Sequence, residues 1–467
     1  MRDIGRLSRG LVLVAVVALM LPATTQAQEP PDVGEATATF DYTQNMHPLG
    51  YSPREAGLAN GSLRAGSFNT DLAFWGNMAV QGTYAGFRLI DVSAPANPRE
   101  VINWEDCASN ANSQGNQGDV IIWENLIIRS WNSGTPASGS QCGNWPMAQG
   151  EEGLHVIDIS DPLNPNVVAF VDTPSGSHTA TLVPDLENNR LLVYNNSAPG
   201  GGFDMIQVPL DDPASASYLG PFITGGGCHD WAVILGDVMR AACSGGGGFR
   251  MFSLGGPSGG SLDAPELLYF VPFFSGHSAA FTFDGKYLVF GWEPGGGGGA
   301  RCTATGTQVT PTTVQTDDMK SYFFFDVETG AEVGKFVLPR DQTITENCTI
   351  HNYNIVPTDK RYVLVAGNYQ SGISVVDFTD PENAEEIAYA DPAPLVNPDN
   401  PAGIELGGDW STYWYNGRIY ESDITRGLII WNLSDPAVAG AKKFGHLNPQ
   451  TAMTSFPFKG AAFGQNN

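Results

Sequence analysis

Charged side chains are scarce in this 467-residue chain, and basic ones are the scarcest. Only 15% of the residues are Asp, Glu, Lys or Arg, and 23 Lys and Arg stand against 49 Asp and Glu, for a net charge of −26. A surface of that sign repels phosphate backbones and anionic lipid headgroups. The composition therefore argues against nucleic acid and membrane surfaces as partners. It favours cations, basic partners or simple solubility, as in a saline habitat.

Long apolar runs are also missing. The longest occupies residues 11–21, about half of the ~20 residues that a bilayer span needs. Three Arg precede it, and small residues follow it up to Ala27, which is typical of a secretory signal. The sequence predicts a cleaved signal peptide over residues 1–27 and a product that is secreted, extracellular or held in the cell envelope. A retained anchor is the alternative.

Helical periodicity is the third absence. After residue 27 no segment follows a 3.6-residue period, whereas Gly is abundant at 56 residues and the apolar share of 42% is ordinary for a globular chain. This mixture indicates turn-rich structure made of short β-strands.

One strand motif recurs along the chain. It opens on Gly, alternates β-branched with polar residues, and ends in Asp or Asn before a Pro turn, which predicts a strand that stops where Pro cannot donate a hydrogen bond. Its clearest copies begin at Gly86, Gly153, Gly372 and Gly427, and weaker copies begin at Gly202, Gly248 and Tyr322.

A hairpin that opens on His or Asp precedes every copy. The seven openers are Asp71, Asp119, His178, His229, His277, His351 and Asp409. They recur at intervals of 48 to 74 residues, against the ~40–50 residues of a four-stranded propeller blade without insertions. We therefore expect an all-β fold, a seven-bladed β-propeller of four-stranded antiparallel blades. An open sandwich would not need seven equal repeats.

The run from Gly153 to Pro165 resembles the LVIVD repeat of secreted bacterial β-propellers. The resemblance implies a propeller and export, and no particular chemistry. It weakens in the third, fourth and fifth units, where Gln207, Ser253 and a shifted Tyr322–Asp326 segment replace the motif.

The expected organisation has four parts. These are the signal peptide at 1–27, an N-terminal extension at 28–66 that is a candidate closing strap, the propeller at 67–450 and a C-terminal tail at 451–467. We expect residues 35–51 to lie against the seventh blade, and the outermost strand of that blade to lie near 441–447. Which terminus closes the ring stays open at this point.

Four long insertions fall on one side of this scheme. In a propeller, the connections from second to third strand and from one blade to the next share one face, here called the loop face. The insertions are Ser133–Glu152, Pro294–Lys320, Arg340–Cys348 and Asp391–Gly407, and all fall in such connections. Long loops gathered on one face favour function there.

The six cysteines contain no Cys-x-x-Cys pair, so zinc-ribbon and thioredoxin-like sites are excluded. In an exported chain an even number of cysteines indicates disulfides. Of the 15 pairings that six cysteines allow, we predict the one that joins neighbouring loops and hairpin ends: Cys107 with Cys142, Cys228 with Cys243, and Cys302 with Cys348.

The seven openers should ring the channel mouth on the loop face, since equivalent positions of repeated strands are related by the rotation of the ring. Four of the seven His in the chain fall at this phase. Imidazoles and carboxylates that converge in this way are ligands for a divalent metal, with His178, His229 and His277 as the best trio. The alternatives are that the openers bond the backbone of the next blade, or that they touch an organic ligand directly.

Aromatic and acidic residues at the rim are candidate ligand contacts, although they can equally pack the insertions onto the blades. They are Trp131, Trp145, Trp292, Glu293, Tyr369, Trp410 and Tyr413.

We therefore expect an exported binding or interaction module for a small molecule, glycan or protein. The alternative is a metal-dependent hydrolase or oxidoreductase with Glu293 or Glu346 as base. A purely structural surface protein is the third hypothesis.

Overall fold

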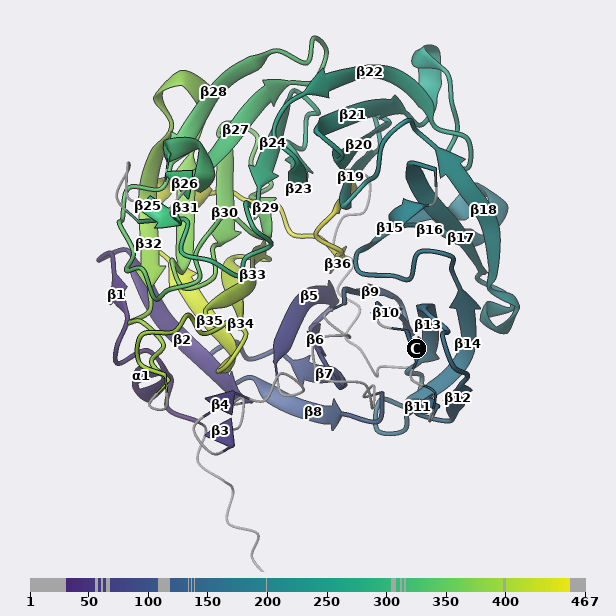
Figure 1. The fold of residues 1–467 in the computed structure, drawn as a ribbon, viewed down its shortest axis with the longest axis horizontal. Coiled ribbons are helices and arrows are strands. Elements are labelled where there is room, and N and C mark those ends of the chain that lie inside the picture. The colour runs from purple at the N-terminus through teal and green to yellow at the C-terminus, as the bar shows by residue number, and fades with distance from the viewer. Residues whose placement is uncertain are drawn as a thin grey trace, which may run out of the picture. The chain divides into compact units, whose positions relative to one another are not determined.

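The computed structural model describes residues 31–54, 58–59, 62–63, 68–107, 118–132, 134–135, 137, 139–198, 200–303, 308–310, 313–314, 316–397 and 400–453. The predicted signal peptide lies outside these residues. Within them, seven sheets of four or five strands stand around a common axis (Figure 1). The expected all-β, seven-bladed propeller is confirmed.

The strands run outward from the axis in each blade. Blade 1 consists of β5 (Asn69–Trp75), β6 (Met78–Thr83), β7 (Gly86–Asp91) and β8 (Arg99–Trp104). Blade 2 consists of β9 (Val120–Trp123), β10 (Leu126–Trp131), β13 (Gly153–Asp158) and β14 (Asn166–Asp172). Blade 3 consists of β15 (Ala180–Asp185), β16 (Arg190–Ala198), β17 (Gly202–Pro209) and β18 (Ser217–Ile223). Blades 4 and 5 are β19 (Asp230–Leu235), β20 (Arg240–Gly245), β21 (Gly248–Ser253), β22 (Glu266–Pro272); and β23 (Gly276–Phe281), β24 (Tyr287–Trp292), β27 (Ser321–Asp326), β28 (Glu332–Val337). Blades 6 and 7 are β29 (Tyr353–Ile355), β30 (Val363–Gly367), β31 (Ile373–Asp377), β32 (Glu385–Asp391); and β33 (Asp409–Tyr415), β34 (Arg418–Asp423), β35 (Gly427–Leu433), β2 (Met46–Pro53).

Smaller elements decorate this ring. The short strands are β1 (Asp41–Tyr42), which pairs with β32, and the hairpins β3 (Leu58–Ala59) with β4 (Ser62–Leu63), β11 (Ser140–Cys142) with β12 (Trp145–Met147), and β25 (Gln308–Thr310) with β26 (Thr313–Val314). The helical elements are α1 (Val33–Ala36) and the 3-10 turns Leu186–Asn188, Pro213–Ser215, Gly256–Ser258, Asp317–Lys320, Pro381–Asn383 and Pro436–Val438. None of these described helices has the length and apolar character that crossing a bilayer requires.

The two fixed residues of the repeat have local physical reasons. At Gly86 and Gly153, where the third strand begins, a Cβ would collide with a backbone carbonyl of the fourth strand, so only Gly fits. At the other end, the Asp158 carboxylate accepts a hydrogen bond from Ser160 N at 2.8 Å and closes the turn that leads to the fourth strand. The repeat thus encodes where its strand starts and stops.

The N-terminal extension supplies the closing strand. β2 pairs with β35 antiparallel from Met46 opposite Leu433 to Pro53 opposite Gly427, which makes it the outermost strand of blade 7. In Figure 1 this purple strand lies beside the yellow β35. The expectation that residues 441–447 form that outermost strand is wrong, because β2 already occupies this edge of β35.

The C-terminal segment instead enters the central channel. β36 (His446–Leu447) pairs with β5 of blade 1, and β37 (Thr451–Met453) pairs in parallel with β19 of blade 4. Figure 1 shows this yellow segment crossing the centre of the ring. Its two strands pair with the ends of β5 and β19 that are opposite to the openers, so it occupies the channel on the face away from the long insertions.

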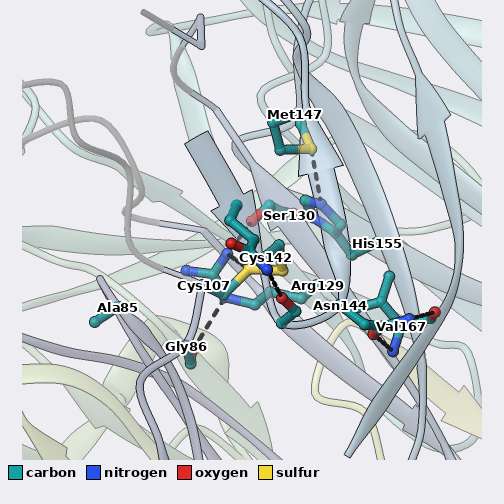
Figure 2. The surroundings of a disulfide bond; sticks show 12 residues. Ala85, Gly86, Cys107, Arg129, Ser130, Cys142, Asn144, Met147, His155 and Val167 are labelled. Atoms are coloured by element: carbon teal, nitrogen blue, oxygen red, sulfur yellow. Dashed lines mark hydrogen bonds between the residues drawn. A yellow bond between two sulfur atoms is a disulfide. The ribbon is translucent and has the colours of Figure 1, made fainter. Parts of the chain in front are cut away.

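Two predicted disulfides are formed, Cys107–Cys142 and Cys228–Cys243. Figure 2 shows the first of them, which ties the connection entering blade 2 to the insertion after β10. The buried Arg129 beside it donates to the carbonyl oxygens of Gly86 at 3.1 Å and Thr83 at 3.0 Å, and so links blade 2 to blade 1.

The third predicted pairing is not formed, and Cys302 and Cys348 are free thiols. Their segments are joined through the backbone instead, with Arg301 N donating to Cys348 O at 3.3 Å and Cys302 N donating to Cys348 Sγ at 2.7 Å. Burial raises the pKa of the Cys302 thiol, and this disfavours the thiolate that oxidation requires.

Candidate functional site

Four imidazoles line one arc of the channel on the loop face. His178, His229, His277 and His351 stand at the start of the inner strands of four consecutive blades, so the rotation from blade to blade brings them side by side. Their ring centroids are 5.3 Å apart from His178 to His229, 4.3 Å from His229 to His277, and 4.7 Å from His277 to His351. We call this arc, with Trp292 and Glu293 at its edge, the channel mouth.

The three Asp openers do not complete this ring. Asp119 N donates to His178 O at 3.3 Å, and the Asp119 carboxylate accepts from Ala180 N at 3.1 Å, so it lies one position further along the inner strands than the imidazoles. Asp119 groups with Asp71 and Asp230, whose carboxylates interact electrostatically with its own. Asp230 is the residue after His229. Asp71, Asp119 and Asp230 are the inner acid group.

Asp409 lies elsewhere. The position next to His351 in blade 7 is taken by Trp410, whose carbonyl accepts a hydrogen bond from His351 Nδ1. The Asp409 carboxylate accepts from Thr412 Oγ1 at 2.9 Å and clusters with Glu421 and Asp423 of β34. The prediction of one ring of seven openers is therefore wrong, because a shift of one residue along a strand turns a side chain to a different neighbour.

Burial sets the protonation of the inner acid group. Burial raises the pKa of Asp230 to about 8. Burial also raises the pKa of Asp119 well above its usual range, and repulsion by Asp71 and Asp230 adds to that shift. The carboxyl of Asp71 accepts from Tyr413 Oη at 2.6 Å and from Gln450 Nε2 at 3.3 Å, and its pKa is raised as well. Asp230 therefore keeps a proton at neutral pH that an exposed carboxylate has lost.

The Asp230→Asn variant is expected to be more stable than the wild type at pH 8 by about 1–3 kcal/mol, with little difference near pH 4. Because the pKa of Asp230 is raised on folding, the folded state binds more protons than the unfolded chain between the unfolded value near 4 and about 8, and wild-type stability falls as the pH rises through this window. Asn retains the acceptor for Trp231 N and never ionises. Urea unfolding at both pH values measures the effect, with the exposed Asp212→Asn as control. Equal gains at pH 4 and pH 8 would contradict it.

A second group of side chains converges at the channel mouth. The Glu293 carboxylate, at the end of β24, has Oε2 at 3.6 Å from His277 Nε2 and Oε1 at 3.7 Å from His351 Nε2. One ligating atom from each of the three residues lies within 4.8 Å of the other two. Tyr369 Oη donates to Glu293 Oε1 at 2.7 Å and fixes the carboxylate.

Three histidines of the arc, His229, His277 and His351, are neutral at physiological pH. Burial lowers the pKa of His229 and of His351 to about 3, and burial also holds the pKa of His277 well below its usual range. The same burial raises the pKa of Glu293 to about 8. Neutral imidazoles offer a nitrogen lone pair, which is the form that binds metal ions or hydrogen-bond donors.

The predicted metal trio is only partly brought together. His277 does join a group with metal-ligating geometry, but its partners are Glu293 and His351 rather than His178 and His229. His178 Nδ1 is hydrogen-bonded to Asn132 Nδ2 at 2.8 Å, and His229 Nδ1 bonds His277 O at 3.2 Å. The pairing of Gly276 with Trp292 puts Glu293 just beyond the end of the hairpin that carries His277, and no sequence motif marks this register.

The predicted aromatic rim is largely interior. Trp131 is fully buried and packs against His155 at 5.3 Å, so it does not line the mouth. Trp410 and Tyr369 are also buried, but both pack on His351, with ring centroids 5.2 and 4.3 Å away. Trp292 is half-buried and stacks on Phe274 at 4.2 Å.

The remaining rim candidates are placed as follows: Tyr413 is buried and donates to Asp71, while Trp145 is half-buried in β12. Glu346, the other candidate base, is buried, and its Oε2 accepts from Thr343 N at 2.6 Å.

A cleft of about 500 Å³ lies on the opposite face, beside Phe283, Tyr362 and Lys442. Two pairs of its polar groups bond each other: Tyr362 Oη donates to Asp284 at 2.7 Å, and Lys442 pairs with Asp359 at 2.6 Å.

The fold and the repeat define a seven-bladed β-propeller with a His-lined channel mouth. The family model for the LVIVD repeat matches residues 71–106 and 147–173, which cover nearly all of blade 1 and the two outer strands of blade 2, β13 and β14. The chain is thus a β-propeller that contains LVIVD repeats. No match to a curated protein was found.

Proposed function

We propose that this chain is an exported binding module that takes up a small molecule, glycan or protein segment at the channel mouth. The observation that carries the proposal is the asymmetry of the channel. On the loop face, four imidazoles and Glu293 converge and His178, His229 and Trp292 are partly exposed, whereas the C-terminal segment fills the other end. The two disulfides support the proposal, because they tie down connections of the same face.

A paired screen tests this function. Wild-type protein, a Trp292→Ala plus His178→Ala variant, and the control Leu163→Ala are applied to a glycan array and to a small-molecule thermal-shift panel. Leu163 is 61% exposed in the turn between β13 and β14, on the face away from the mouth. We expect at least one compound to bind wild type and the control, and to lose affinity ~10-fold or more in the double variant. Compounds that bind all three proteins equally, or no binding at all, would contradict the proposal.

The grouping of His277, Glu293 and His351 favours a second candidate, a metal-dependent hydrolase or oxidoreductase. Two imidazoles and one carboxylate form the ligand set of catalytic zinc sites and of non-haem iron oxygenases. Both candidates use the same mouth and differ in whether the captured molecule is transformed.

A further inference from the structure

We infer that His277, His351 and Glu293 bind one divalent transition-metal ion at the channel mouth, through the two Nε2 atoms and the carboxylate. This metal site lies at the same channel mouth as the proposed binding function, and its ion would contact the captured molecule. The site belongs to blades 5 and 6, whereas the trio that the spacing of the openers indicated belongs to blades 3 to 5.

The distances suit such an ion. Tetrahedral coordination with bonds of about 2.0–2.1 Å places neighbouring ligand atoms about 3.3 Å apart. The carboxylate oxygens lie 3.6 and 3.7 Å from the two imidazole nitrogens, so small side-chain rotations complete the site. The three ligands come from the inner strand and the second strand of blade 5 and from the start of blade 6, which a rigid ring holds in place.

In His351, a hydrogen bond to the other ring nitrogen selects the ligating tautomer. His351 Nδ1 bonds the carbonyl of Trp410, and a carbonyl can only accept, so Nδ1 carries the proton and Nε2 keeps its lone pair for the ion. A backbone carbonyl on the far nitrogen is the usual support of a metal-binding histidine.

His277 carries the second line of evidence. Its side chain is 7% exposed, its Nδ1 has no hydrogen-bond partner among the described residues, and its Nε2 comes no nearer than 3.6 Å to Glu293. Buried polar groups normally have a partner. A metal ion would give Nε2 a partner closer than this carboxylate oxygen, while Nδ1 would carry the ring proton.

Tyr369 is the positioning residue of the site. Its hydroxyl donates to Glu293 Oε1 at 2.7 Å, and its ring packs on His351. Its φ of 51° lies in the left-handed region, which a Tyr adopts only when its surroundings impose it. Its backbone N donates to Asp409 O at 3.1 Å and holds this conformation, so Glu293 Oε2 stays directed towards His277.

The ligand set narrows the choice of metal ion. Two imidazoles disfavour Mg²⁺ and Ca²⁺, which prefer oxygen ligands, and suit Zn²⁺, Fe²⁺ or Co²⁺. Three protein ligands also leave a position open, which would take water or an oxygen or nitrogen donor of the captured molecule.

The test is a titration of chelator-treated, full-length mature protein with Zn²⁺ by calorimetry and with Co²⁺ by visible absorption. We expect one ion per chain, with Ca²⁺ unable to compete. Glu293→Gln and His351→Ala should each raise the Kd at least ~100-fold, and Tyr369→Phe should raise it ~10-fold while leaving the chain folded by circular dichroism. The matched controls His178→Ala and His47→Ala should change it less than ~3-fold.

Sub-stoichiometric binding to wild-type protein would overturn the inference, whatever the variants do. Binding lost in His178→Ala but kept in Glu293→Gln would overturn it too, because the ion would then sit on the other end of the arc. The ligand screen, repeated with metal-free protein, separates the two proposals. If a compound binds but the titration finds no stoichiometric metal, the metal site alone is contradicted. If a metal binds but no compound does, the binding function alone is contradicted.

Discussion

Replacing Arg88 by alanine is expected to lower the free energy of unfolding by about 3–5 kcal/mol. Arg88 is fully buried in β7, and its guanidinium joins blade 1 to the closing strand. Nη2 donates to Ser52 Oγ at 2.7 Å and to Pro53 O at 3.1 Å in β2, while Nε pairs with Glu100 at 2.7 Å. Removing the guanidinium leaves these acceptors without a donor and opens a cavity at the seam where the ring closes.

Urea unfolding of Arg88→Ala beside Arg99→Ala measures this effect. Arg99 is in the next strand of the same blade, its side chain is 70% exposed, and it pairs with Asp91 at 3.2 Å. Because exposed ion pairs contribute little, its loss should change the free energy of unfolding by less than about 1 kcal/mol. If the two variants were equally stable, the guanidinium of Arg88 would not hold the seam.

Replacing Asn448 by alanine is expected to destabilise the fold by about 2–4 kcal/mol. Asn448 lies between β36 and β37 in the channel, where its side chain accepts from Ile122 N and donates to Ile122 O, both at 2.8 Å. Ile122 is in β9, the inner strand of blade 2, which has no further strand on its channel side. The amide of Asn448 therefore replaces one step of a β-ladder, and alanine leaves two buried backbone groups unpaired.

Hydrogen exchange of the β9 segment, together with urea unfolding, tests this prediction. Exchange at Ile122 should become faster in Asn448→Ala. The exposed Asn383→Ala, which loses one bond of 3.0 Å to Asp380, should leave exchange in β9 unchanged. Unaltered exchange at Ile122 in the Asn448 variant would show that the C-terminal segment does not support the inner strand.

The repeat was readable because its causes are local. The Gly at 86 or 153 is required by a carbonyl of the next strand, and the Asp at 158 closes a turn two residues away. The four strands of blades 1 to 6 therefore each lie in one continuous segment of the chain, and seven copies of the pattern predict seven blades.

The closure of the ring was not readable in the same way. β2 pairs with a strand almost at the other end of the chain, and no motif marks β2 as the partner of that strand. Of residues 441–447, His446 and Leu447 pair with β5 of blade 1, because the edge of β35 is covered by β2.

The candidate site shows the same division on a smaller scale. The spacing of the repeats singled out the four histidines, and the end of a strand singled out Glu293. Whether an opener faces the mouth or the layer beneath it depends on a register difference of one residue, which separates Asp119 from His178. Because these repeats contain insertions and depart from the motif, their sequence does not show which of the two registers a given opener adopts.

By itself, the sequence determined the propeller, the number of blades, the loop face and two disulfides, because all of these follow from patterns repeated over short distances. Only the tertiary structure decided which strand closes the ring, that the C-terminal segment fills the channel, and that Glu293 joins His277 and His351. Those features depend on contacts between residues far apart in the chain, where a rotation about the axis of the ring, rather than spacing along the sequence, brings side chains together.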